Sequence, residues 1–157
     1  MTPPATTGIM PLHDPAEFLE WRRETLTEVF GAVPDPAVME SNARYIPPHM
    51  ADGSLVCFVA TSGGVRAGVG AVCFQHELPS PDNITGACAY LMNIYVRKPY
   101  RRLGIGSKIV SVLVDIAAQR GCGKIYLEST EGATNLYSSL GFTRLTGYYS
   151  LTQMPKQ

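Results

Sequence analysis

The sequence predicts an α/β fold in which helices cover both faces of a mixed β-sheet. Three observations support this prediction. An apolar run ends at Val96 before a short basic turn, an amphipathic helix follows the turn, and a strand hairpin lies upstream. A hairpin followed by strand, helix, strand, helix and strand favours a mixed sheet between helices. We expect one domain over residues 1–157, a length that allows a full core.

The N-terminal half contains two helix starts and a hairpin. Asp14-Pro15 and Asp35-Pro36 each place a capping aspartate before a proline that suits the first helical position. We expect the first helix to run to Phe30 and the second to end before Pro47-Pro48. A short edge strand over 8–12, strands over 55–60 and 67–75, and a glycine turn between the latter two complete this half.

The C-terminal half alternates strands and helices. The apolar run 87–96 predicts a buried strand, and the helix that follows over 104–120 has apolar residues at helical spacing: Ile105, Ile109, Val112, Leu113, Ile116 and Ala117. Gly121 should stop this helix. A strand over 125–128, a short helix over 132–140 and a final strand or hairpin over 142–151 follow.

The turn Arg101-Arg102-Leu103-Gly104-Ile105-Gly106 has the features of an anion site. The first amides of a helix lack internal partners and lie at the positive end of the helix dipole. Glycines let an anion approach this backbone, and arginines add positive charge. The spacing excludes a Walker A loop, because Ser107 separates Gly106 from Lys108, and Ile109 stands where a dinucleotide fingerprint needs its third glycine.

Two motifs resemble those of one enzyme family. Arg101-x-x-Gly104-x-Gly106 resembles motif A of the GNAT superfamily of N-acetyltransferases, which holds the pyrophosphate of acetyl-CoA. Leu136-Tyr137-x-x-x-Gly141-Phe142 is similar to motif B of the same family. The resemblance extends over about residues 87–142, whereas the N-terminal half matches only as a pattern of elements.

The resemblance implies a GNAT-like, mostly antiparallel sheet in which one strand pair splays apart to hold acetyl-CoA. The strand ending at Val96 should bulge and part from the strand near Ile125. Tyr137 matches the family tyrosine that protonates the CoA sulfur. Thr130 stands where many members have a pantetheine-binding asparagine, and it either replaces that contact or only caps a helix. The implied cofactor-binding residues are Ile94, Tyr95, Val96, Arg101, Arg102, Leu103, Gly104, Ile105, Gly106, Ser107 and Thr130.

The general base and the acceptor-binding residues are less defined. Members with a fifth-strand glutamate have it twelve residues before the tyrosine, where this chain has Ile125. Glu128, His76, a relayed water and an amine that arrives neutral remain open as alternatives. Asn93 interrupts an apolar run, and a buried amide must be hydrogen-bonded. It either faces the acceptor or ties down the splayed strand.

The expected function is acetyl transfer from acetyl-CoA to a primary amine by direct attack. The amine belongs to a small molecule, a peptide N-terminus or a lysine. The alternative is a non-catalytic acyl-CoA-binding or regulatory module, which the missing base keeps open.

Composition limits the partners. Thirteen basic residues balance thirteen acidic ones, so no charge field predicts binding to nucleic acid or to an anionic membrane. The chain has no apolar run long enough for a membrane span and no N-terminal signal pattern. Its four cysteines lack Cys-x-x-Cys spacing and its three histidines lack ligand spacing. We expect a cytoplasmic protein without a metal, and pairing into a homodimer is open.

Overall fold

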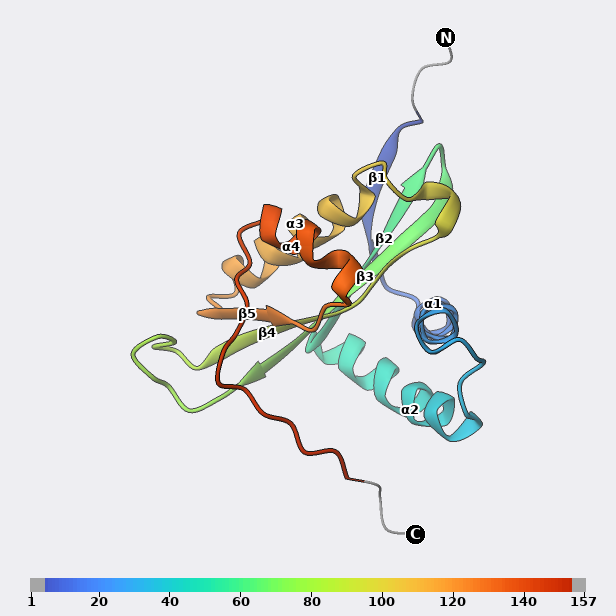
Figure 1. The fold of residues 1–157 in the computed structure, drawn as a ribbon. Coiled ribbons are helices and arrows are strands. Elements are labelled where there is room, and N and C mark those ends of the chain that lie inside the picture. Colours follow the sequence, from blue (N-terminus) through green and yellow to red (C-terminus); the bar gives the residue numbers. More distant parts are fainter. Residues whose placement is uncertain (1–4, 154–157) are drawn as a thin grey trace.

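A five-stranded sheet forms the centre of the molecule in the computed structural model, which describes residues 5–153 (Figure 1). The strands follow the chain order across the sheet: β1 (Thr7–Leu12), β2 (Leu55–Ser62), β3 (Val65–His76), β4 (Ala87–Val96) and β5 (Lys124–Leu127). All neighbours are antiparallel except β4 and β5, which are parallel. The predicted mixed, mostly antiparallel sheet is therefore confirmed. The predicted domain and the N-terminal segment without a signal pattern include residues 1–4 and 154–157, which lie outside the described residues.

Helices cover both faces of the sheet, as predicted (Figure 1). α1 (Pro15–Phe30) and α2 (Pro36–Asp52) lie on one face over a core that includes Trp21 and Ile46. α3 (Ile105–Gln119) lies on the other face, where Ile109 and Leu113 are fully buried. Two short 3-10 helices, η1 (Lys98–Tyr100) and η2 (Glu131–Ala133), and the short helix α4 (Thr134–Ser139) complete the element list. No helix among residues 5–153 has the length and apolar character needed to cross a membrane.

α2 continues through its two prolines, contrary to the expectation that it ends before them. Pro47 and Pro48 remove two backbone donors inside the helix, which usually breaks it. Here both prolines are exposed, whereas Ile46 between the helix and the sheet is 2 % exposed. Burial of Ile46 holds the second half of the helix on the core, and Gly53 ends it in a left-handed conformation. Tertiary packing therefore outweighs the local signal.

The expectation of a final strand or hairpin over 142–151 is wrong. Residues 142–153 form an irregular segment that crosses the β5 side of the sheet (Figure 1). Phe142 packs edge-on against the Tyr137 ring, with ring centroids 5.8 Å apart. Beyond it the large side chains are exposed: Leu145, Tyr148, Tyr149 and Leu151. A strand needs a partner ladder and a buried face, and this segment has neither within the described chain.

β4 contains a bulge at Asn93, as the resemblance implied. Val69 pairs with Tyr95 and Ala71 with Met92, so the single residue Gly70 opposes both Asn93 and Ile94. Asn93 has φ +55°, a left-handed conformation that asparagine tolerates better than most residues. Because of the extra residue, two consecutive side chains of β4 point toward the α1–α2 face.

β4 parts from β5 immediately before this bulge. Their parallel pairing runs from Cys88 with Lys124 to Leu91 with Leu127 and ends there. The second half of β4, Met92–Val96, therefore has a strand partner on the β3 side only, within the described residues. This is the splayed pair that the sequence predicted, and it leaves backbone groups of β4 free for a ligand.

Gly70 should be essential to this geometry. An added Cβ would overlap Ile109 Cγ2 and lie only 3.1 Å from Ile94 Cδ1 and 3.2 Å from Leu113 Cδ1. We therefore expect Gly70→Ala to lower the free energy of unfolding by about 1–3 kcal/mol, because the core must shift to admit a methyl group.

Gly132→Ala is the matched control, because its added methyl meets nothing within 4 Å. Its stability should stay level or rise by less than about 1 kcal/mol. Urea unfolding followed by circular dichroism measures both variants. Equal stabilities for Gly70→Ala and the wild type would show that α3 does not need this close approach.

Candidate active site

The turn between β4 and α3 presents a row of unused backbone donors. Gly104 caps α3 with φ +78° and no side chain covers the helix start. Within the described chain, none of the amides of residues 103–107 donates to a protein acceptor, and the first helical bond runs from Lys108 N to Gly104 O. These amides lie at the positive end of a fifteen-residue helix. The turn can therefore hold an anion by backbone contacts.

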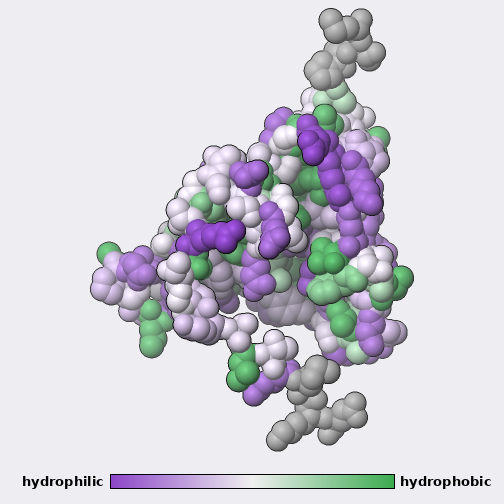
Figure 2. All heavy atoms as spheres, in the orientation of Figure 1, coloured by the Kyte–Doolittle hydropathy of each residue, from purple (hydrophilic) through white to green (hydrophobic). Residues whose placement is uncertain are grey.

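The two motifs of the sequence meet at this turn. A Cβ added to Gly106 would lie 3.5 Å from Leu136 Cδ2 on α4 and 4.0 Å from Val96 Cγ2 at the end of β4. α4 therefore closes over the start of α3, beside the end of β4. The surface in Figure 2 is hollowed between α1 on one side and α4 with the C-terminal segment on the other.

Arg101, which is expected to bind the cofactor, also makes contacts within the protein. Its Nη2 contacts both carboxylate oxygens of Glu28, at 2.6 and 2.7 Å, and its Nε donates to the Val96 carbonyl at 2.7 Å. The hydrogen bond from Arg101 lowers the pKa of Glu28 below its ordinary value, so the pair is ionised at neutral pH. Arg101 therefore joins the turn to α1, and only its Nη1 is uncommitted among the described residues.

Arg102 is an exposed cation at the turn, next to the start of α3. It makes no ion pair within residues 5–153, and its φ of +63° is unusual for a residue with a side chain. Strongly hydrophilic side chains gather over this segment in Figure 2. A charged side chain held at the turn by such a backbone can reach a bound anion.

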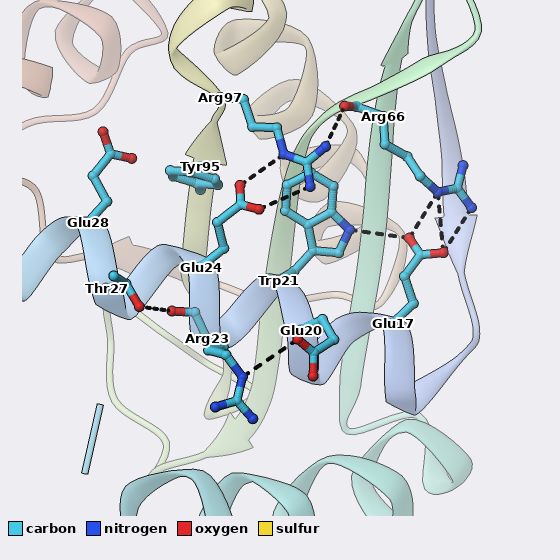
Figure 3. A pocket seen from close by; sticks show the side chains of 10 residues that line it. All are labelled: Glu17, Glu20, Trp21, Arg23, Glu24, Thr27, Glu28, Arg66, Tyr95 and Arg97. Atoms are coloured by element: carbon cyan, nitrogen blue, oxygen red, sulfur yellow. Dashed lines mark hydrogen bonds and ion pairs between the residues drawn. The ribbon is translucent and has the colours of Figure 1, made fainter. Parts of the chain in front are cut away.

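Arginines and glutamates form a ladder that fixes α1 on the sheet (Figure 3). Glu17 pairs with Arg66 at 2.9 Å and Glu24 with Arg97 at 2.9 Å, next to the Glu28 pair. The ladder lines an open depression of about 770 Å³. Its charges are already balanced pair by pair, so we interpret it as a structural clamp.

Tyr137 is buried on α4 and has the protonation state that a proton donor requires at neutral pH. Its side chain is 9 % exposed and belongs to the apolar core on the α3 face of the sheet. Its hydroxyl has no protein partner in the described structure. Burial raises the pKa of Tyr137, so the phenol stays protonated at neutral pH.

The candidate bases differ in position. His76 pairs with Ala87, six residues along β3 from Gly70, which is about 20 Å at 3.3 Å per residue. Glu128 directly follows the last β5 residue paired with β4, so it lies level with Met92. It is exposed, and next to burial its charge is the main influence that raises the pKa of Tyr90. The distance from the bulge therefore argues against His76 as the general base, and Glu128 stays open as a candidate.

Thr130 does not cap its helix through its side chain. Its backbone carbonyl accepts from Ala133 N at 3.1 Å, but η2 has no side-chain cap bond. The hydroxyl is exposed at the end of β5. This removes the capping alternative and leaves pantetheine contact as the prediction.

Asn93 ties β4 to α1. Its Oδ1 accepts from Arg22 Nη1 at 3.1 Å, and its Nδ2 donates to Thr25 Oγ1 at 3.1 Å. It also lines a cavity of about 220 Å³ between α1, α2 and the sheet. Asn93 therefore anchors the bulge, and a contact between Asn93 and the acceptor stays a prediction.

Sequence reasoning missed the other polar walls of this cavity, chiefly Arg22, Asn42 and Tyr45. A signal for Arg22 exists in the helix period. Phe18, Trp21, Thr25 and Leu26 form the buried stripe of α1, and Arg22 occupies an inward position of the same stripe. A charged residue at such a position predicts a polar pocket or a buried partner.

No group of three or more potential metal ligands lies together within residues 5–153. The candidate site consists of backbone amides, one buried tyrosine and, on the opposite face of the sheet, a mostly apolar cavity with a few polar side chains.

Comparisons with known proteins agree with this geometry. The model of the acetyltransferase (GNAT) family matches residues 16–142. A thialysine N-epsilon-acetyltransferase from Sus scrofa is 40% identical over 65 residues, which are 40% of this chain and 38% of that protein. The matched stretch is thus well under half of the curated relative.

Solved structures share the whole fold. A predicted acetyltransferase from Clostridium acetobutylicum, crystallised with acetyl-CoA, has a TM-score of 0.84 at 23% identity and covers 94% of this chain and 96% of its own. A GCN5-related N-acetyltransferase from Ralstonia eutropha JMP134 has a TM-score of 0.79 at 24% identity, with 94% and 99% covered. Because the family model matches residues 16–142, which are most of the chain, the chain belongs to the acetyltransferase (GNAT) family.

Proposed function

We propose that this protein is an acetyl-CoA-dependent N-acetyltransferase that moves an acetyl group directly to a primary amine. One observation carries the proposal. β4 parts from β5 after Leu91, directly before a turn whose amides at 103–107 have no protein acceptors. An acetyl-CoA molecule with its pyrophosphate at that turn and its pantetheine arm along the free half of β4 would have its thioester at the Asn93 bulge.

The reaction requires three events at this place. The amine nitrogen attacks the acetyl carbonyl carbon, the carbon–sulfur bond breaks, and the departing thiolate takes up a proton. A free backbone N–H between Ile94 and Val96 would stabilise the oxyanion. The phenol of Tyr137 would supply the proton to sulfur, since burial keeps it protonated. The ammonium acceptor loses its protons to a base or to water.

The base is assigned only to a short list. Glu128, level with Met92 on β5, is the carboxylate next to the parting strands. A relayed water and an amine that arrives neutral need no side chain at all. Because no residue is assigned as the base, the second candidate function is a non-catalytic acyl-CoA-binding or regulatory module.

Turnover separates the two functions. Release of free CoA thiol from acetyl-CoA is measured against a panel of small amines, peptides and lysine derivatives. The proposal requires acetylated product in a 1:1 ratio with thiol. CoA affinity with no product from any amine would favour the binding module, and absence of CoA affinity would contradict both.

A cytoplasmic location is part of the proposal. Cys57, Cys73, Cys88 and Cys122 are all free thiols, and a reducing compartment keeps thiols in this state.

Arg102 should bind the pyrophosphate with its side chain. Arg102→Ala removes a charge-assisted contact, so CoA affinity should fall about tenfold or more. Arg44→Ala removes one exposed charge from α2 and serves as the control, with unchanged affinity. Calorimetry with CoA and with pantetheine, which lacks the pyrophosphate, measures the effect. An Arg102→Ala protein that binds CoA like the wild type would refute this contact.

Gly106 should let the pyrophosphate approach the backbone. In Gly106→Ala the new methyl makes only ordinary contacts with Leu136 and Val96, so melting should stay within a few degrees of the wild type. If the pyrophosphate approaches the helix start here, as proposed, the same methyl would take up part of its space, and CoA affinity should fall by about tenfold or more. The prediction fails if the variant melts normally and retains full CoA affinity.

Tyr137→Phe should impair chemistry but not binding. It keeps the ring that packs against Phe142 and removes only the hydroxyl. We expect kcat to fall by about 10²–10⁴ while the KM for acetyl-CoA stays level. Because the pKa of Tyr137 is raised, loss of this acid in the wild type should begin only above about pH 10.

Tyr149→Phe, at a side chain that is 97 % exposed, provides the control. Steady-state kinetics from pH 6 to 11, with chemistry shown to be rate-limiting, measures both variants. Equal turnover by Tyr137→Phe and the wild type would leave this tyrosine with a packing role alone.

A further inference from the structure

Arg22 is the unbalanced charge of α1. The four glutamates of this helix each pair with another arginine: Glu17 with Arg66, Glu20 with Arg23, Glu24 with Arg97 and Glu28 with Arg101. Arg22 points away from this ladder and makes no ion pair with any carboxylate of residues 5–153. The helix therefore presents a neutralised face and, on its other side, one uncompensated guanidinium.

The guanidinium lies in the 220 Å³ cavity between α1, α2 and the sheet, where it is half-buried. Burial lowers the pKa of Arg22, although an arginine stays charged at neutral pH. Taking a charge out of water is costly unless an opposite charge or a set of hydrogen bonds compensates it. A partly buried cation without a carboxylate partner is therefore a strong point of attraction for an anionic ligand.

Two amide side chains aim this guanidinium. Asn42 Oδ1 accepts from Arg22 Nε at 3.3 Å, and Asn93 Oδ1 accepts from Nη1 at 3.1 Å. Each amide is itself oriented, since Asn42 Nδ2 donates to the Val38 carbonyl and Asn93 Nδ2 to Thr25. Of the five N–H groups of Arg22, one on Nη1 and two on Nη2 remain without a partner. Nη1 and Nη2 can together bind a carboxylate with two parallel hydrogen bonds.

The cavity adjoins the place where acetyl transfer would occur. Its β4 wall consists of Met92 and Asn93, the two consecutive side chains that the bulge turns toward α1 and α2. Its other walls include the apolar side chains of Phe18, Ile46 and Leu55. Its volume lies below the range of roughly 300–1,000 Å³ that is usual for drug-sized ligands. The space suits a molecule of amino-acid size.

We propose that this cavity is the acceptor site and that Arg22 binds the carboxylate of a small amine of the amino-acid class. The inference rests on the proposed acetyltransferase function and names the acceptor for it. The carboxylate would pair with the free N–H groups of Arg22, the apolar part would contact Phe18 and Ile46, and the amine would face the bulge at Asn93. A peptide N-terminus lacks this carboxylate on its first residue and should be a poor acceptor.

The test compares matched acceptors and matched variants. Free amino acids of increasing chain length, from glycine to lysine, are assayed with acetyl-CoA beside their methyl esters and beside aminoalkyl phosphates. The wild type should use the best free acid at least about tenfold more efficiently, in kcat/KM, than its ester. Arg22→Gln should bring this ratio close to one. Because the variant also loses a hydrogen bond that holds Asn93, the rates with acid and ester should fall together, and the ratio between them reports the carboxylate contact. Arg23→Gln, which removes the neighbouring charge that pairs with Glu20, should keep the full ratio.

Arg22→Lys keeps the charge without the two-pronged donor, and it should restore part of the preference. Equal use of acids and esters by the wild type, or a preference that survives in Arg22→Gln, overturns the assignment. Preference for the phosphates over the acids also overturns the carboxylate class.

A binding measurement separates this inference from the function on which it rests. Calorimetry of the same acids with the CoA-loaded protein reports the Arg22 contact without turnover. Acid binding that Arg22→Gln abolishes, with no acetyl transfer to any amine, would contradict the enzyme function and uphold the carboxylate site. Acetyl transfer without a preference for acids would uphold the enzyme function and contradict the carboxylate site. If the protein shows no acid binding and no acetyl transfer, both proposals are contradicted.

Discussion

The backbone of Asn93 is the constraint on which the site depends. In its left-handed conformation it places one extra residue in β4 opposite Gly70. This conformation is unfavourable for a side-chain-bearing residue, and it persists only where the surroundings hold it. Hydrogen bonds to Arg22 and Thr25 on α1 supply that hold. The helix α1, which packs on this face of the sheet, therefore fixes the left-handed backbone of Asn93 within β4.

Both parts of the proposed site lie beside this one distortion. On the edge toward β5, pairing ends at Leu91, so the second half of β4 has free backbone groups beside the amides of the α3 turn. On the α1–α2 face, Met92 and Asn93 both project into the small cavity. In the proposed reaction, the donor and the acceptor would thus reach one short segment of β4 from separate sides. The glutamate–arginine ladder keeps α1 at the correct distance, and Arg101 extends the ladder to the turn.

Much of this arrangement could be predicted from the sequence, because its signals are local. Glycines and arginines at the turn, the apolar period of α3 and the tyrosine of α4 act through neighbours in the chain or through one helix face. Predictions failed where distant packing decides. α2 passes through Pro47 and Pro48 because Ile46 is buried, and residues 142–153 form no strand because no ladder partner receives them. The carboxylate partner of Arg101 and the amide partners of Arg22 lie on other elements 20 to 73 positions away in sequence, and no periodicity identifies them.

The central claim is that acetyl-CoA occupies the gap between the parted strands, with its pyrophosphate on the amides of α3. A crystal structure of the complex with CoA tests it most directly. The claim requires pyrophosphate oxygens within about 3.2 Å of the amide nitrogens of residues 103–107 and the sulfur between Tyr137 and the Asn93 bulge. It would be contradicted by CoA bound elsewhere on the molecule. A pyrophosphate held by Arg101 after rupture of its pair with Glu28, with the amides left free, would contradict it equally.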